Sequence, residues 1–181
     1  MPAGHMNSIL LIFFSLSLVL HALVSQDSST PNLPPEVISA LDERFPHWRF
    51  PEVSDEIRDF LKKNVAPDAR PEFIEGDFNG DGKLDCAVLI EQGAVPNESG
   101  ETIGYNVYIA AFMKRNAGYK LYVMGGNEYV TLVKKGDKDY DYETGKTFTY
   151  DNDAIFTGIF EKAGTSYIFE NGKFRAIITS D

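Results

Sequence analysis

Oxygen-bearing side chains recur at alternate positions in one short stretch of the sequence, GDFNGDGKLD. Counted from Asp77, they occupy positions 1, 3, 5 and 9 (Asp77, Asn79, Asp81 and Asp85), and the main-chain carbonyl of Lys83 stands at position 7. This is the ligand spacing of calcium loops, in which a tightly coiled backbone aims alternate residues at one ion. Calcium takes about six to eight oxygen ligands. The spacing therefore predicts one structural Ca²⁺ ion held by these five residues.

The other residues of the stretch suit such a coil. Gly80 and Gly82 permit the backbone to turn tightly, and Phe78 and Leu84 are expected to point away from the ion and anchor the loop to the core. Position 12, where an EF-hand has a bidentate glutamate, holds Val88 in an apolar segment typical of a strand. The site is therefore expected to be weak. An Asx-rich turn without an ion is the alternative, although its three carboxylates would repel one another.

The stretch resembles the DxNxDGxxD loop of FG-GAP and VCBS repeats, in which an acidic residue at position 9 closes the site and strands flank the loop on both sides. The resemblance covers residues 76–90. It implies ligand roles for Asp77, Asn79, Asp81, Lys83 and Asp85. In those families the loop recurs once per blade of a β-propeller, whereas it occurs once in this sequence, so their function is not implied. The layout is also similar to small exported bacterial proteins that carry a single loop of this kind.

An almost unbroken apolar run, Ile9–Leu20, lies near the N-terminus. It is shorter than the roughly 20 apolar residues that cross a bilayer, and it is typical of a secretory signal peptide. We therefore expect a signal peptide over residues 1–26, a polar linker over residues 27–34 and one α+β domain over residues 35–181. The protein is then secreted or periplasmic, without membrane attachment after signal removal. A membrane anchor is the alternative interpretation.

The chain is acidic, with 27 acidic and 17 basic residues and a formal net charge of −10. This balance does not suit a nucleic-acid partner. A cationic protein or a metal cation fits such a field better, and the tyrosines along the strands could offer a stacking surface to a carbohydrate. Solubility alone is the simpler explanation of the charge.

Two short amphipathic helices are predicted before the strands, over residues 36–45 and 54–65, and Ser54 is a good N-cap for the second. Each ends near a proline, Pro46 or Pro67. The side chains expected to face the core are Val37, Ile38, Leu41 and Phe45 in the first helix and Ile57, Phe60, Leu61 and Val65 in the second.

From residue 71 onward, short apolar segments alternate with turn residues. Asn116–Gly118 and Asn171–Gly172 predict tight hairpins, which require antiparallel strands. Since helices and strands are segregated along the chain, we predict an α+β fold. Its two helices pack on an antiparallel, mainly meander sheet of about seven or eight strands.

A second acidic stretch contains Asp137, Asp139, Asp141 and Glu143 at alternate positions. It could form a second cation site or contact a basic partner. Because it has no glycine at the coil position, a solvated acidic hairpin is favoured. The later stretch Asp151–Asp153 is interpreted as a turn.

No residue pattern selects an enzymatic mechanism. His47 is the only histidine beyond residue 26, and it lies in a proline-bracketed connector without a nucleophile elbow. Cys86 is expected to be a buried small apolar residue without a disulfide partner.

A non-enzymatic binding module with a structural Ca²⁺ ion is the leading hypothesis. A secreted hydrolase with a carboxylate pair and an acidic inhibitor of a cationic enzyme are the alternatives, although the spacing selects no such pair.

Overall fold

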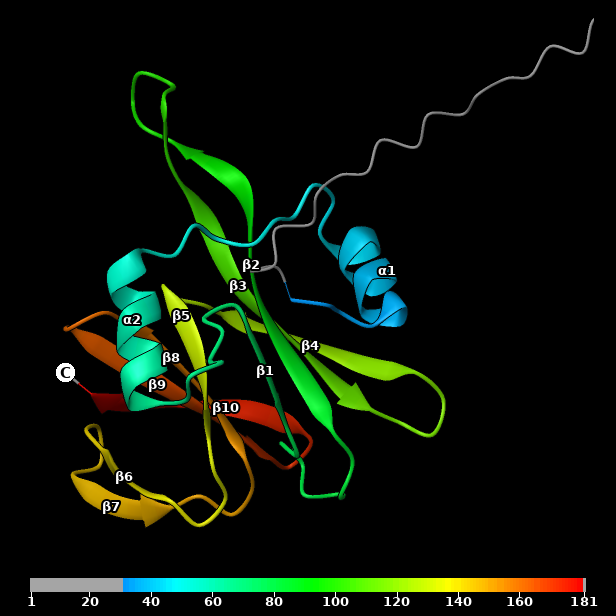
Figure 1. Ribbon diagram of the computed structural model, residues 1–181, viewed down its shortest axis with the longest axis vertical. Coiled ribbons are helices and arrows are strands. Elements are labelled where there is room, and N and C mark those ends of the chain that lie inside the picture. The colour runs from blue at the N-terminus through cyan, green and yellow to red at the C-terminus, as the bar shows by residue number, and fades with distance from the viewer. Residues whose placement is uncertain (1–30, 181) are drawn as a thin grey trace, which may run out of the picture. The chain divides into compact units, whose positions relative to one another are not determined.

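The computed structural model describes residues 31–180, in which two short helices precede ten strands (Figure 1). The α+β class, with the helices first, is confirmed. The predicted signal peptide (residues 1–26) and residues 27–30 of the linker lie outside the described residues. Neither helix in residues 31–180 is long and apolar enough to cross a membrane.

The strands form three antiparallel sheets instead of one mainly meander sheet. The first has the order β1-β2-β3-β4, with β1 (Phe73–Gly76), β2 (Asp85–Pro96), β3 (Thr102–Lys114) and β4 (Tyr119–Gly125). The second has the order β10-β9-β8-β5, with β5 (Tyr129–Val133), β8 (Ala154–Ile159), β9 (Ala163–Glu170) and β10 (Lys173–Ser180). The third is the hairpin of β6 (Lys138–Asp141) and β7 (Lys146–Thr149).

The meander breaks after β4. Strand β5 pairs with β8, on the far side of the β6–β7 hairpin in the sequence, and not with β4. Residues 31–180 contain ten strands, where we expected about seven or eight. The two predicted hairpins are confirmed, since β3 pairs with β4 and β9 with β10. In the second, Asn171 and Gly172 have φ of 51° and 79°, as a two-residue hairpin turn requires.

Helix α1 (Pro35–Arg44) covers the outer face of the first sheet. Val37 and Leu41 are buried against alternate residues of β2 and β3, such as Val88 and Phe112. Ile38, expected to face the core, is exposed, because a residue adjacent to Val37 lies about 100° around the helix from it.

Helix α2 (Asp55–Asn64) covers the outer face of the second sheet. Ile57 and Leu61 pack against Tyr129 of β5, whereas Phe60 and Val65 are exposed, contrary to expectation. Figure 1 shows α2 beside β8 and α1 next to the first sheet.

A hydrophobic core lies between the two four-stranded sheets. Ala87 and Leu89 of β2, with Ile109 of β3, face Val130 and Ile155 of the second sheet. Because α1 covers the opposite face, β2 and β3 are apolar on both faces in this part of the first sheet. This explains their continuous apolar runs.

Beyond the first sheet, β2 and β3 continue as a two-stranded arm, residues 92–106. Strand β1 reaches along β2 only to Val88, and β4 reaches along β3 only to Tyr108. Residues of the arm pair with one another, from Gln92 with Asn106 outward. Figure 1 shows this β2–β3 arm extending past the other strands.

Candidate functional site

The loop predicted to bind calcium connects β1 to β2, and Gly76 pairs with Asp85 across its base. The predicted strand–loop–strand arrangement is therefore confirmed. Gly80 and Gly82 have φ of 73° and 79°, a left-handed conformation that glycine adopts without steric cost. These two residues let the backbone coil as the sequence predicts.

Side chains of the loop turn inward onto its own amides. Asp77 Oδ1 and Asn79 Oδ1 both accept hydrogen bonds from the Asp81 amide, at 3.0 and 2.9 Å. Asp77 Oδ2 accepts from the Gly82 amide at 2.9 Å, and Asp81 Oδ1 accepts from the Lys83 amide at 3.0 Å. Two oxygens that share one N–H must lie close together, so the structure brings the Asp77 and Asn79 side chains to one place.

Asp85 occupies a different environment from the other predicted ligands, because it is fully buried. Its Oδ1 accepts from the Lys114 amide at 2.6 Å and its Oδ2 from the Phe78 amide at 3.2 Å. Burial raises the pKa of Asp85 to about 6, although the two hydrogen bonds lower it. The negative charges of Asp81 and Asp77 raise this pKa further. Asp85 thus holds the start and the end of the loop to β3.

The donor set of the loop suits a hard cation, since it consists of oxygens alone. Within residues 31–180, no three His, Cys, Asp or Glu side chains are grouped so that they could hold one metal ion, but the predicted set also includes an amide and a carbonyl. Asp77, Asn79 and Asp81 would hold the ion together with the Lys83 carbonyl. Asp85 would join them through lone pairs that its two amide hydrogen bonds leave free. The bound cation would offset the repulsion among the three carboxylates.

Phe78 and Leu84, both expected to anchor the loop, behave differently. Phe78 is fully buried and packs edge-to-face with Phe174 of β10 at 6.3 Å. Leu84 is 59% exposed, so the expectation for this residue was wrong. The buried residue at this end of the loop is Asp85. Because successive residues of an extended chain point to opposite sides, Leu84 faces away from the side on which Asp85 is buried.

Two residues that the sequence assigned only to a turn support the loop from outside. Asp153 Oδ2 accepts from the Asp77 amide at 3.2 Å, and its Oδ1 accepts from the Lys135 amide at 3.0 Å. A Cβ at Gly80 would lie 2.4 Å from Asn152 Oδ1, so the two residues are in contact. Residues this distant from the loop carry no local signal that could have predicted these contacts.

Burial would raise the pKa of Asp153, but other effects outweigh it. Hydrogen bonds from the amides of Lys135 and Asp77, together with the Lys134 ammonium 3.4 Å away, hold the pKa of Asp153 below its usual value. The ionised carboxylate is therefore the form that the fold favours at this position.

The acidic stretch at residues 137–143 forms the hairpin that the sequence favoured. Its carboxylates are engaged separately: Asp139 Oδ2 accepts from the Tyr150 hydroxyl at 2.8 Å, and Asp141 Oδ1 accepts from the Thr144 amide at 3.2 Å. The structure therefore uses these acids to hold the hairpin and does not gather them around one centre.

The remaining sequence candidates have structural positions. Cys86 is buried and unpaired, as expected, and burial raises the pKa of its thiol to about 12. His47 is exposed in the connector between the helices. The buried thiol of Cys86 therefore lacks the environment of an activated nucleophile.

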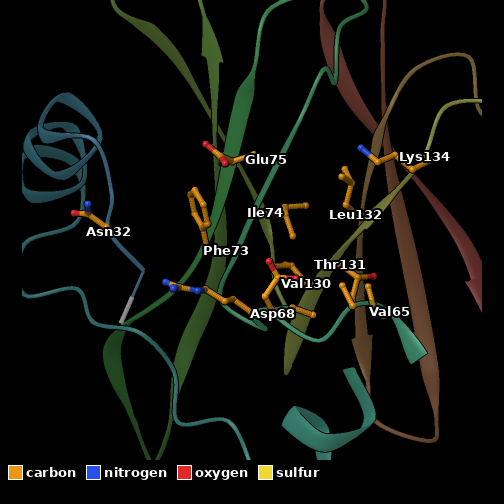
Figure 2. A pocket seen from close by; sticks show the side chains of 13 residues that line it. Asn32, Val65, Asp68, Phe73, Ile74, Glu75, Val130, Thr131, Leu132 and Lys134 are labelled. Carbon is orange, nitrogen blue, oxygen red and sulfur yellow. The ribbon is translucent and has the colours of Figure 1, made fainter. Parts of the chain in front are cut away.

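Two hollows of similar volume open on the described surface. The β1–β5 hollow, about 660 Å³, lies between the edge strands of the two large sheets, with Phe73 and Ile74 on one side and Leu132 on the other (Figure 2). The α2 groove, about 670 Å³, lies between the start of α2 and the base of the β2–β3 arm. Asp85, the carboxylate with the raised pKa, lines neither hollow.

Comparison with family models, with curated proteins and with solved structures gives no match for this chain. Function is consequently proposed from the sequence and from the geometry of the described residues.

Proposed function

We propose that this chain is an exported calcium-binding domain that acts by binding a partner and not by catalysis. One observation carries the metal proposal: the side-chain oxygens of Asp77 and Asn79 meet at the Asp81 amide inside a loop coiled by two left-handed glycines. That coil supports the ligand roles of Asp77, Asn79, Asp81, Lys83 and Asp85 that the FG-GAP and VCBS resemblance implies. The proposal takes the ligand roles from those repeats and leaves their function aside.

The proposed ion has a structural role. Strand β1 has four residues and pairs only with β2 among the described strands. The loop joins these two strands, so an ion that rigidifies the loop also fixes β1 on β2. Without the extra closing glutamate of an EF-hand, the affinity is expected to be in the weak range of extracellular modules, where calcium is abundant.

Calorimetric titration with calcium tests the metal proposal. The chain is titrated alongside Asp81→Ala and a matched control, Asp59→Ala, which removes the same charge from an exposed position on α2. We expect heat of binding from the unchanged chain and from Asp59→Ala, and none from Asp81→Ala. Equal heats from all three proteins would refute the site.

Export is proposed from the apolar run Ile9–Leu20. The chain is expressed in bacterial cells, and the N-terminus of the product outside the cytoplasm is determined by mass spectrometry. We expect a start near Asp27. A product that retains its first residues and stays in the membrane fraction would favour the anchor interpretation.

A further inference from the structure

The α2 groove has the size and the walls of a binding site. Four parts of the chain that are distant in sequence form it: the start of α2 with the residues before it, the base of the β2–β3 arm, the β4–β5 connector and the β8–β9 turn. Its volume of about 670 Å³ lies within the range of about 300–1,000 Å³ that is usual for ligand sites. At Gly104, which lines the groove, an added Cβ would meet nothing within 4 Å.

The charge of the groove is strongly negative. Glu52, Glu56, Glu91 and Glu128 line it, opposed by Lys162. Glu91 is buried and paired with Arg49, and Glu128 accepts a hydrogen bond from the β8–β9 turn. Glu52 and Glu56 are exposed, so these two carboxylates are available to a ligand in the groove.

A guanidinium is already held at the edge of the groove. The Arg49 guanidinium lies over the Tyr105 ring, 4.1 Å from its centroid, while Arg49 Nε donates a hydrogen bond to Glu91. Tyr105 and Glu91 both line the groove. An aromatic face beside a carboxylate is the combination that recognises a planar cation. In this contact the chain's own Arg49 meets both groups, so a guanidinium is already bound within the fold at this edge.

We propose that the α2 groove binds an arginine-containing or lysine-containing segment of a partner protein. The inference rests on the proposed function, since it names the partner class of the binding module. Glu52 and Glu56 receive the basic side chains, and the aromatic rings of Tyr105 and Phe160 contact their apolar parts. A neutral sugar could stack on the same rings but would leave the carboxylate charge without a counterpart. The net charge of −10 would steer a basic partner toward the chain.

Calorimetry on the full chain tests the inference with a defined probe. The probe is an acetylated, amidated hexapeptide of alternating arginine and glycine, and its glutamine counterpart is the uncharged comparison. We expect the arginine peptide to bind at least about tenfold more tightly than the glutamine peptide. Removing two of the groove charges with Glu52→Gln/Glu56→Gln should weaken binding about tenfold.

The matched control removes the same charge elsewhere. Glu36→Gln/Glu43→Gln changes two exposed glutamates of α1, one of them in the first turn of its helix, as Glu56 is in α2. We expect it to alter the affinity less than about twofold. Gly104→Leu provides a second, uncharged variant, because an added Cβ at this position of the groove lining meets nothing within 4 Å. If the added bulk enters the groove, we expect it to weaken peptide binding about tenfold as well.

Three outcomes would overturn the inference: no binding of the arginine peptide, equal weakening by both glutamine pairs, or a β-linked glucose tetrasaccharide that binds in its place. Calcium titration of the same variants separates this result from the metal proposal. Groove variants that lose the peptide should keep the calcium heat. If calcium binds normally and the peptide does not, the groove inference alone fails.

Discussion

At the scale of single residues, the two glycines of the coil share a left-handed backbone but differ in their surroundings. A Cβ at Gly80 would lie 2.4 Å from the side-chain oxygen Oδ1 of Asn152, whereas a Cβ at Gly82 would meet nothing within 4 Å. Both substitutions by alanine carry the cost of positive φ, about 1 kcal/mol. Gly80→Ala also forces the Asn152 side chain aside.

We therefore expect Gly80→Ala to destabilise the chain by about 0.5–1 kcal/mol more than Gly82→Ala. Urea unfolding of both variants measures the difference, and Asn152→Gly in the Gly80→Ala background should remove it. Equal costs for the two alanine variants would show that Asn152 does not contact the loop in solution.

Asp153 gives the loop a pH-dependent support. The pKa of Asp153 is lowered in the folded chain. Its contribution to the free energy of unfolding is therefore fully present above the pKa of the unfolded chain, near 4, and is lost as the pH falls through the lower pKa of the folded chain. Asp153→Asn should cost about 1–3 kcal/mol at pH 7. Denaturation at several pH values should show this difference constant from pH 7 to about 5 and shrinking below about 4. A difference that does not change with pH would contradict the assignment.

At the scale of elements, Phe78 anchors the loop to the core, whereas Leu84 does not. Phe78→Ala should cost about 3–5 kcal/mol, because it opens a cavity between the sheets. Leu84→Ala should change the stability by less than about 0.5 kcal/mol, because the side chain is exposed. Thermal or urea unfolding compares the two variants, and similar costs would mean that Leu84 packs in solution.

The β6–β7 hairpin is tied to the second sheet through a buried hydroxyl. The Tyr150 hydroxyl lies 2.8 Å from Asp139 Oδ2 and 2.7 Å from Ser166 Oγ. Its one proton goes to the carboxylate, so Ser166 donates to Tyr150 and a chain of hydrogen bonds joins β6 to β9. The hairpin therefore depends on a side chain that follows β7.

Tyr150→Phe should destabilise the chain by about 1–3 kcal/mol, since it removes the hydrogen bonds of this hydroxyl to Asp139 Oδ2 and Ser166 Oγ. Hydrogen exchange should accelerate most at the amides of β6 and β7. Tyr140→Phe, which removes a hydroxyl from a more exposed ring, is the control and should have little effect. Unchanged exchange in the hairpin of Tyr150→Phe would contradict the role of this hydroxyl.

At the scale of the whole molecule, the proposed ion and the folding equilibrium are linked. Calcium at about 100 times its Kd adds about 2.7 kcal/mol to the free energy of unfolding. For a chain of this length the corresponding rise in Tm is about 5–10 °C. Differential scanning calorimetry with calcium and with a chelator measures it, and magnesium at the same concentration serves as a control. An equal rise in Asp81→Ala would mean that the ion acts elsewhere on this acidic chain.

The local patterns in the sequence were sufficient for several elements. The spacing from Asp77 to Asp85 predicted the loop between two strands, Asn171–Gly172 predicted a hairpin, and the apolar periodicity predicted both helices. Each of these features depends on residues within a few positions of one another, where backbone conformation and side-chain direction are set by neighbours. The coil, the turns and the helix-first order are therefore contained in the sequence itself.

Features that join distant residues were decided by packing. Four such features are the pairing of β5 with β8, the burial of Phe78 but not Leu84, the support of the loop by Asp153 and the acidic α2 groove. Each brings together segments that are distant in the sequence. Burial of apolar area between layers selects these contacts, and that area depends on which strands become neighbours in space. A pattern that repeats over two or four residues holds no information about such neighbours. The coil of the loop could therefore be predicted from the chain alone, and its surroundings could not.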